Sequence, residues 1–240
     1  MLRARTRGGD FFFKAVPVLF AGEPALTREL GRRHPGRAPT VVAADAERRW
    51  LLMRDFDGAA LSEQDTDAVC DALRAYARHQ VEWIGAVDHL YTLGCPDRTL
   101  DALEGEIDAV LGDTPALLPG RSEGLSPTQL SRLPELADRL RAACARLRGY
   151  ELPPTLEHGD LHPGNIRRRD DGFLVFDWSD GCVSVPFFSL VPFLEVGARH
   201  LVEAFELAEL LSTRRSATTA SRGTRKHAPA GNGSACFRTS

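Results

Sequence analysis

Residues 156–178 read LEHGDLHPGNIRRRDDGFLVFDW and carry the most specific chemical pattern in the chain. An acid, Asp160, and an amide, Asn165, lie five positions apart, and a Pro-Gly pair between them indicates a tight loop. A second acid, Asp177, follows an Asp-Asp-Gly turn and the apolar run 173–176, which predicts a short strand ending at this carboxylate. The stretch therefore predicts one loop and one strand end that carry three oxygen-bearing side chains.

The order of these side chains matches the protein-kinase template. There, a catalytic-loop Asp is followed five residues later by an Asn, and a metal-binding Asp follows a hairpin. In the transfer of a γ-phosphoryl group the protein mainly positions the reactants and stabilises charge, and it forms few covalent bonds itself. Such a site orients a hydroxyl with one carboxylate and holds Mg²⁺ with hard oxygen ligands. The residue types in this stretch suit that chemistry.

The motif HGDLHPGN, followed by FDW, resembles that of the aminoglycoside phosphotransferase family, kinase-like enzymes that phosphorylate hydroxyls of small molecules. The resemblance implies an α+β, protein kinase-like, two-lobed fold with a reduced β-rich small lobe and a mainly helical large lobe. It also implies ATP and Mg²⁺ as cofactors and a small-molecule hydroxyl as the acceptor. By the same resemblance Asp160 is the catalytic base, Asn165 and Asp177 are Mg²⁺ ligands, and His158 and His162 support the loop.

A metal-dependent hydrolase is a rival interpretation of the same loop. His158, Asp160 and His162 alternate along the chain, and imidazole and carboxylate groups bind Zn²⁺. This interpretation gives no role to Asn165 or to the strand end at Asp177, and the sequence shows no second cluster of His and Asp. Hydrogen bonding to the backbone within the turn is the more ordinary role for the two histidines alone.

A single lysine interrupts the apolar run 11–20, which is predicted to be a strand. Lys14 must reach a counter-charge or water, because burying an unpaired ammonium group is costly. In the kinase template the strand lysine holds the nucleotide phosphates and pairs with a glutamate on a helix. The alternative is a lysine that extends to solvent at a sheet edge. The downstream motif favours the phosphate role.

The partner glutamate of Lys14 is one of two residues in a predicted helix that starts near Glu23 and Pro24. In sequences of the resembled family the pairing glutamate lies seven residues before a helix leucine, and Glu23 with Leu30 fits that spacing. Glu29 lies fifteen residues after Lys14, which is a more usual separation for such pairs, so it is the second candidate. We favour Glu23. For either residue, a solvated glutamate at the positive end of the helix dipole is the alternative.

Composition and turn signals divide the chain into three parts. We expect residues 1–57 to form a partial small lobe on the nucleotide side and residues 58–212 to form a large lobe with the catalytic loop. By the resemblance, residues 53–58 are the hinge between the lobes. Residues 213–240 hold six Lys or Arg and no acid, which predicts a disordered basic tail.

Periodic patterns predict the elements of these parts. Two strand-like runs, 40–44 and 49–53, are joined by a polar turn. Apolar residues at helical spacing mark helices at 100–111 and 133–147, and we expect their apolar stripes to face the core. The apolar segment 194–211 predicts a last helix pair.

Composition excludes several classes of function. With 240 residues, of which 43% are hydrophobic, the chain is long enough to bury a core. A net charge of −3 does not favour a general nucleic-acid binder. No apolar run approaches the ~18 residues of a membrane span. The five cysteines are scattered without a C-x-x-C pair, which predicts a reduced, cytoplasmic protein.

The start of the chain departs from the kinase pattern. A kinase-like small lobe begins with two strands and a phosphate-covering, glycine-rich loop, but only residues 1–9 precede the Lys14 strand. We therefore expect a truncated start, an exposed apolar edge on the lysine strand and weak ATP binding. The leading function is transfer of a phosphoryl group from ATP to a small-molecule hydroxyl. The second is an inactive remnant with weak or no nucleotide binding, and the third is the hydrolase built on His158, Asp160 and His162.

Overall fold

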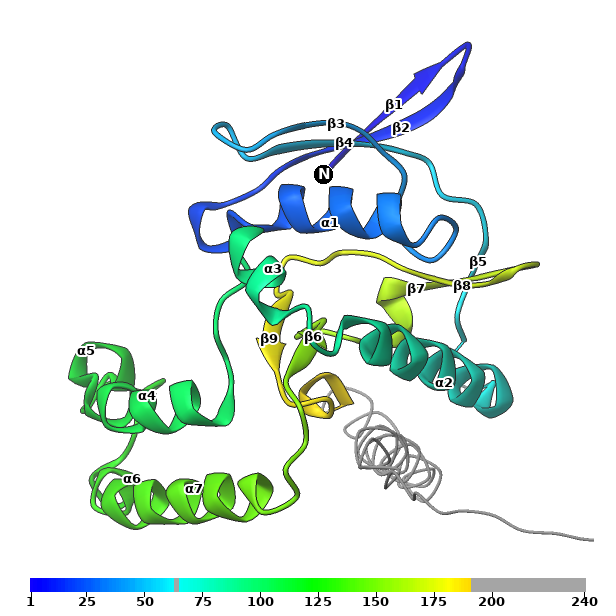
Figure 1. The fold of residues 1–240 in the computed structure, drawn as a ribbon. Coiled ribbons are helices and arrows are strands. Elements are labelled where there is room, and N and C mark those ends of the chain that lie inside the picture. Colours follow the sequence, from blue (N-terminus) through cyan, green and yellow to red (C-terminus); the bar gives the residue numbers. More distant parts are fainter. Residues whose placement is uncertain (63–64, 191–240) are drawn as a thin grey trace, which may run out of the picture.

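The computed structural model describes residues 1–62 and 65–190 (Figure 1). The N-terminal part of the chain builds an antiparallel sheet of four strands in the order β1-β2-β4-β3. Its two central strands are rich in aromatic and other apolar residues, and its edge strand β3 begins with two valines, residue types that suit a pleated surface. The strands are β1 (Leu2–Thr6), β2 (Gly9–Ala15), β3 (Val41–Asp45) and β4 (Trp50–Arg54).

The strand that carries Lys14 is shorter than predicted. It spans Gly9–Ala15 rather than residues 11–20, because Pro17 has no N–H for a sheet ladder and Val18–Phe20 form a 3-10 turn. In the register, Lys14 lies opposite Leu51 of β4.

The expected exposed apolar edge on the lysine strand is wrong. Residues before Gly9 form β1, so β2 lies between β1 and β4 and is an inner strand. β1 is the edge, is exposed along its whole length and carries Arg3 and Arg5. Cationic side chains on an edge strand discourage pairing with another chain. One strand and the short Arg7-Gly8 turn precede the lysine strand.

Helix α1 (Glu23–Arg33) lies between this sheet and the rest of the molecule (Figure 1). Pro24 occupies its first turn, a position where the missing N–H costs nothing. Leu26 and Leu30 are four apart and therefore share one face, and both are fully buried. That face points to the second half of the structure, so α1 joins the two halves.

The chain leaves β4 through residues 55–58, where the hinge is expected, and enters the second half. Gly58 has a φ of +126°, and a Cβ there would lie 2.7 Å from the carbonyl oxygen of Arg168, so no larger residue fits. A small sheet of order β5-β7-β8 and a pair β6-β9 follow. Their strands are β5 (Ala59–Ala60), β6 (Thr155–Glu157), β7 (Ile166–Arg169), β8 (Gly172–Val175) and β9 (Cys182–Ser184).

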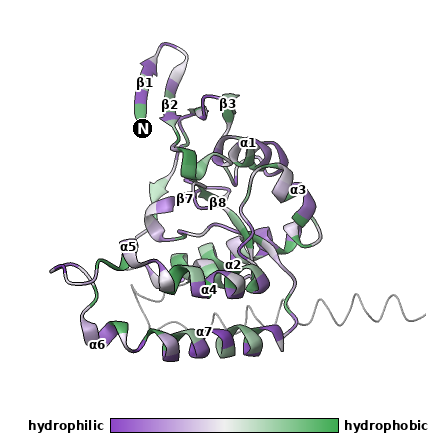
Figure 2. Cartoon of the chain, turned by 90° about the vertical axis from the view of Figure 1, so that its left-hand side faces the viewer, coloured by the Kyte–Doolittle hydropathy of each residue, from purple (hydrophilic) through white to green (hydrophobic). Residues whose placement is uncertain are grey.

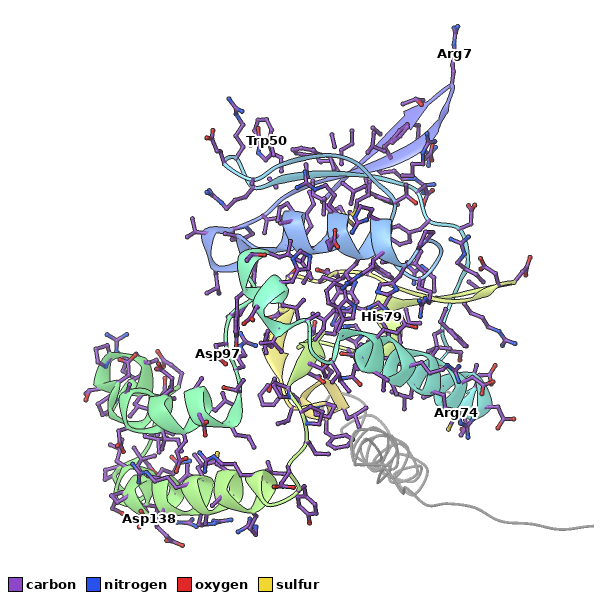
Figure 3. The ribbon with its side chains drawn as sticks, viewed as in Figure 1. Arg7, Trp50, Arg74, His79, Asp97 and Asp138 are labelled. Atoms are coloured by element: carbon purple, nitrogen blue, oxygen red, sulfur yellow. The ribbon has the colours of Figure 1, made fainter. Side chains whose placement is uncertain are left out.

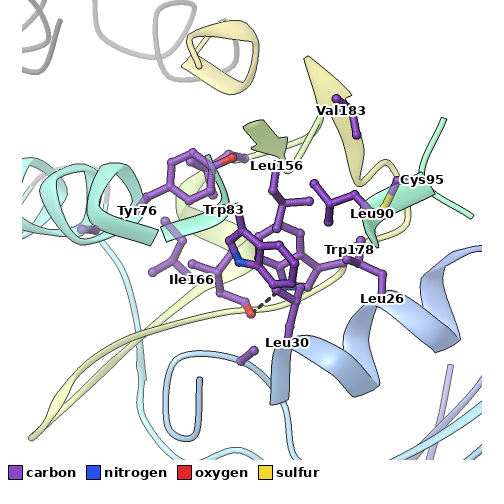
Figure 4. Close-up of a cluster of buried hydrophobic side chains, with 14 of the residues drawn as sticks. Leu26, Leu30, Tyr76, Trp83, Leu90, Cys95, Leu156, Ile166, Trp178 and Val183 are labelled. Atoms are coloured by element: carbon purple, nitrogen blue, oxygen red, sulfur yellow. Dashed lines mark hydrogen bonds between the residues drawn. The ribbon is translucent and has the colours of Figure 1, made fainter. Parts of the chain in front are cut away.

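The core lies where α1 meets the second half (Figure 4). Two tryptophans, Trp83 and Trp178, are the largest fully buried side chains. Leu30 of α1 packs in the same cluster as Tyr76 and Trp83 of α2 and Ile166 of β7. The helices that complete this region are α2 (Thr66–Trp83) and α3 (Val87–Thr92).

The predicted helices of the middle of the chain form, and the centres of their apolar stripes are buried, since Ile107 and Ala137 are each 7% exposed, but the stripes face each other and not the main core. α4 (Leu100–Gly112) and α7 (Leu133–Arg148) pack against each other beside the rest of the molecule, with the short α5 (Thr114–Leu117) and α6 (Pro127–Leu130) at their ends (Figure 1). Among the described residues, the core cluster includes no residue of α4 or α7. Val110 is 61% exposed and Leu140 is 39% exposed.

Ion pairs contribute to the contact between these two helices. Arg148 of α7 pairs with Asp101 and Glu104 of α4, and Arg141 pairs with Asp108. Figure 2 shows hydrophobic and hydrophilic residues mixed along both helices. Helical periodicity identifies an apolar stripe but does not say what packs on it, which explains the error.

Two predictions lie outside the described residues: the last helix pair at 194–211 and the disordered tail at 213–240. Among the helices that the structure describes, none is both long enough and apolar enough to cross a membrane.

The packing of α1 predicts a stability difference between two leucines. Leu30→Ala should lower the free energy of unfolding by about 2–5 kcal/mol, because it leaves a cavity in the shared core. The matched control Leu140→Ala lies on a half-exposed helix face and should cost about 1 kcal/mol or less. Urea unfolding followed by the fluorescence of the buried tryptophans measures both. Equal losses would contradict the placement of the core at α1.

Candidate active site

The loop between β6 and β7 is closed by hydrogen bonds at Asn165. The backbone N–H of Asn165 donates to the carbonyl oxygen of His162 at 2.9 Å, and its side-chain Nδ2 donates to the carbonyl oxygen of Asp160, also at 2.9 Å. The N–H of Phe176 donates to the carbonyl oxygen of Asn165 at 3.0 Å, which ties the loop to the end of β8. Asn165 therefore holds the loop around Asp160 next to the strand end that precedes Asp177.

These contacts orient the polar groups of the loop. Because Nδ2 of Asn165 is used as a donor, Oδ1 is the oxygen of this amide that can hold a metal ion. The residue is only 8% exposed, so its side-chain position is fixed by packing. In contrast, the carboxylate of Asp160 is 56% exposed and is accessible to a second molecule.

His158 is a buried support of the loop. Its Nδ1 accepts a hydrogen bond from the N–H of Asp160 at 3.3 Å, so Nε2 carries the proton and donates to the carbonyl oxygen of Phe176 at 3.0 Å. Burial lowers the pKa of His158 to about 4, and the ring is therefore neutral. Both ring nitrogens are engaged, so His158 has no atom left for a metal ion.

His162 holds the tight turn of the loop. Its Nδ1 accepts from the N–H of Gly164 at 3.1 Å, and its Nε2 lies 3.8 Å from Oδ2 of Asp160. A Cβ at Gly164 would lie 2.6 Å from Cε1 of His162, so the glycine permits the close approach of the ring. The ring therefore borders the exposed carboxylate of Asp160.

Lys14 of β2 contacts Asp177, the last acid of the motif. Its Nζ lies 2.7 Å from Oε1 of Glu23, 2.7 Å from Oδ1 of Asp177 and 2.8 Å from Oγ of Ser179. Burial disfavours the ammonium, but the hydrogen bonds to Asp177 and Glu23 outweigh it and raise the pKa of Lys14. The lysine is charged and has two anionic partners from different elements.

The two carboxylates respond differently to this contact. Burial raises the pKa of Glu23 although the Lys14 ammonium opposes that shift. Burial also acts to raise the pKa of Asp177, but hydrogen bonds from Lys14 and Ser179 outweigh it and lower the pKa. Asp177 therefore carries its negative charge, as a carboxylate that binds a metal must.

Asp177 has a left-handed backbone conformation with a φ of +62°. Asp tolerates this region better than most residues, but it still stores strain. The conformation follows directly after β8 and turns the chain, so that the carboxylate meets Lys14. Strained residues of this kind gather at functional sites.

Of the two glutamates considered as partners of Lys14, Glu23 makes the contact. Glu29 faces another direction and binds Arg32 at 2.8 Å and His89 at 3.3 Å. The hydrogen bonds from Arg32 lower the pKa of Glu29 to about 2. Glu23 reaches Lys14 because it opens α1 directly after the turn that leaves β2.

The profile of the phosphotransferase enzyme family, APH, matches residues 6–224. The chain belongs to this family. No curated protein sequence matches it.

Solved structures of phosphotransferases are similar to this APH-family protein at low sequence identity. Choline kinase LicA from Streptococcus pneumoniae is 12% identical with a TM-score of 0.59, and the alignment covers 86% of this chain and 69% of the kinase. The gentamicin complex of APH(2'')-IIa is 16% identical with a TM-score of 0.59, and covers 88% and 75%. An aminoglycoside-3'-phosphotransferase of type VIII is 21% identical with a TM-score of 0.52, and covers 95% and 83%. The predicted α+β, protein kinase-like fold is confirmed.

Sequence reasoning missed Ser179 in this APH-family protein. Its Oγ lies 2.5 Å from Oδ1 of Asp177, 2.8 Å from Nζ of Lys14 and 3.3 Å from Oε2 of Glu23. The hydroxyl thus contacts the lysine and both carboxylates. Its position two residues after Asp177 was the available signal, because a short polar side chain there lies beside the carboxylate.

A buried polar network under the loop was also missed. Glu157 is fully buried and accepts hydrogen bonds from Gln80 and from the N–H and hydroxyl of Ser189. Oγ of Ser189 accepts from the N–H of His158 at 2.9 Å, and Tyr76 donates to the same oxygen at 3.2 Å. Burial raises the pKa of Glu157 to about 8. The sequence signal for this network was an acidic residue, Glu157, directly before the HGD motif.

The pairing of Lys14 predicts different effects for the two glutamates. Glu23→Gln should lower the free energy of unfolding by about 1–3 kcal/mol, because it removes a buried charge partner of the ammonium. Glu29→Gln removes a partner of an exposed arginine and should cost about 1 kcal/mol or less. Urea unfolding at neutral pH compares the two variants. A larger loss in Glu29→Gln would show that the pairing is assigned to the wrong glutamate.

Proposed function

We propose that this protein transfers the γ-phosphoryl group of ATP to a hydroxyl group of a small molecule. The observation that carries the proposal is the contact between Lys14 and Asp177, which lie 163 positions apart and meet at 2.7 Å. One is the cation that phosphates need, and the other is a carboxylate suited to a metal ion. The family membership supports the same reaction class.

The donor set fits Mg²⁺. Asn165 offers an amide oxygen and Asp177 a charged carboxylate, which are hard ligands of the kind that Mg²⁺ prefers. We assign both residues to the metal, and Lys14 with its partner Glu23 to the nucleotide phosphates. When bound, Mg²⁺ neutralises charge on the phosphate oxygens.

Asp160 is the proposed catalytic base. Its exposed carboxylate lies on the same loop as Asn165 and can accept the proton of an acceptor hydroxyl at Oδ1 or Oδ2. The carbonyl oxygen of the same residue is held by Asn165, and its N–H is held by His158. The backbone is thus fixed while the carboxylate stays accessible, an arrangement that positions a base without blocking it.

The hydrolase interpretation finds no support in this geometry. It requires His158 as a metal ligand, but both ring nitrogens of that residue are engaged with backbone groups. The inactive remnant is the alternative that the next two experiments test.

The first experiment is a titration with Mg²⁺·ATP followed by thermal unfolding. A nucleotide that binds the folded state stabilises it by mass action, by about 2.7 kcal/mol at a hundredfold excess over the dissociation constant. We expect the melting temperature to rise with Mg²⁺·ATP, and to rise less with ATP in the presence of a chelator. Asp177→Asn should reduce the effect of the metal. A melting temperature that does not respond to Mg²⁺·ATP would favour the inactive remnant.

The second experiment tests the base. Asp160→Asn should lower turnover by ~10²–10⁴-fold and leave the Mg²⁺·ATP stabilisation largely intact, because the amide cannot accept the proton. ADP formation is measured with a panel of acceptors drawn from the similar structures, namely choline, ethanolamine and gentamicin. Asp170→Asn, in the exposed turn before β8, is the matched control and should retain full turnover. Near-normal turnover of Asp160→Asn would remove this residue from the proposed role.

A further inference from the structure

A second group of potential ligands lies at the other end of α1. His34 caps the C-terminus of α1, while His79 and Glu82 lie three residues apart on α2 and therefore share a face of that helix. Each of the three residues offers one ligand atom, and these atoms all lie within 4.8 Å of one another. Nδ1 of His34 is 3.1 Å from Oε2 of Glu82, and the two imidazole rings have centroids 4.4 Å apart.

The two histidines are buried and incompletely paired. Each is 5% exposed, and Figure 3 shows His79 in the interior between α1 and α2. Within residues 1–62 and 65–190, Nε2 of each ring is buried without a hydrogen-bond partner. Because Nδ1 of His34 accepts a hydrogen bond from Arg37, Nε2 of that ring carries its proton. Nε2 of His79 is therefore the unpartnered nitrogen that can meet an ion, and an unsatisfied buried polar atom, which costs about 1–3 kcal/mol, calls for a ligand or a functional reason.

The rings have the protonation state that metal binding requires. Burial lowers the pKa of His79 to about 3 and also lowers the pKa of His34. Both rings are therefore neutral at physiological pH, and a neutral imidazole nitrogen is a metal ligand.

A cation already occupies part of this group. The guanidinium of Arg37 contacts Nδ1 of His34 at 2.9 Å and both carboxylate oxygens of Glu82, at 3.1 Å and 2.9 Å. The side chain of Arg37 is 41% exposed, so it can swing into solvent. A metal ion that binds here would replace the guanidinium at the same two acceptors.

A small cavity adjoins the group. It has a volume of about 20 Å³ and is lined by His79, Arg37, Tyr76 and Trp178 among others. This is room for one water-sized ligand beside His79. His34 and Glu82 are not among the lining residues, so the cavity borders the site on the side of His79. Zinc sites with three protein ligands take their fourth ligand from solvent.

We propose that His34, His79 and Glu82 bind one transition-metal ion of the Zn²⁺ class and that this ion clips α1 to α2. Two imidazoles and one carboxylate favour Zn²⁺ over the hard ion Mg²⁺. The site is separate from the loop residues Asp160 and Asn165. A backbone hydrogen bond links it to the active site: the carbonyl oxygen of Arg37 accepts from the N–H of Val175, two residues before Asp177.

The full-length chain, freed of metal with a chelator, tests the proposal. Zn²⁺ is titrated in competition with a chromophoric chelator, and Co²⁺ is used as a spectroscopic probe of the ligand geometry. We expect one equivalent of tightly bound Zn²⁺, visible Co²⁺ absorption of four-coordinate intensity and a higher melting temperature with either ion. Absence of stoichiometric binding would overturn the proposal.

Variants locate the ion. Glu82→Gln changes an exposed ligand without threatening the fold and should weaken Zn²⁺ binding by at least about tenfold, as should His79→Gln. Arg37→Gln removes the competing guanidinium and should tighten binding. If His79→Gln does not fold, the opposite effects at Glu82 and Arg37 still decide the outcome.

Two other histidines serve as controls. His89→Gln, on neighbouring α3, and His162→Ala, in the catalytic loop, should both keep one equivalent of Zn²⁺ with unchanged affinity. Binding that persists unchanged in Glu82→Gln and His79→Gln would overturn the proposal. Loss of Zn²⁺ in His162→Ala would do the same, because it would place the ion at the catalytic loop.

Discussion

The structure depends on one charged group, the ammonium of Lys14, which is held between Glu23 and Asp177. The lysine comes from an inner strand of the sheet, the glutamate from the first turn of α1 and the aspartate from the residue after Phe176 at the end of β8. The side chain of Lys14 is 17% exposed, and an ammonium buried to this extent needs such partners, since an unpaired buried charge is costly. The sheet, the helix and the loop must therefore meet at one point. The same contact that unites the two halves of the fold also places a cation beside a potential metal ligand.

Below this contact, burial and exposure divide the polar residues into two roles. Glu157 and His158 are fully buried and hydrogen-bonded to the backbone or to Ser189, so they fix the position of the loop. Asp160 and Asp177 keep about half of their side-chain surface exposed and can meet other molecules. A satisfied buried network gives a rigid support, and the exposed carboxylates gain a defined position from it.

Helix α1 connects the two sites that we propose. Glu23 begins the helix beside Lys14, and His34 caps its other end beside His79 of α2. Leu26 and Leu30 bury the face between these ends in the shared core. The position of the helix therefore depends on hydrophobic packing along its length and on polar contacts at both termini. A metal ion at His34 would add a polar link at the end of α1 that already packs on Trp83.

The sequence by itself determined the local parts of this protein. The spacing of Asp160, Asn165 and Asp177, the strands near residues 41–45 and 50–54 and the helices of the middle of the chain all follow from turn residues and from hydrophobic periods, which act over a few positions. The tertiary structure alone decided that β1 pairs with the lysine strand and that α4 and α7 pack on each other. It also decided that Ser179 contacts Lys14 and that His34 lies beside His79 and Glu82. The physical reason is that these outcomes depend on contacts between elements: the bonds from Arg37 to Glu82 and from Lys14 to Asp177 span 45 and 163 positions. No short-range pattern records which faces of a sheet or helix will meet.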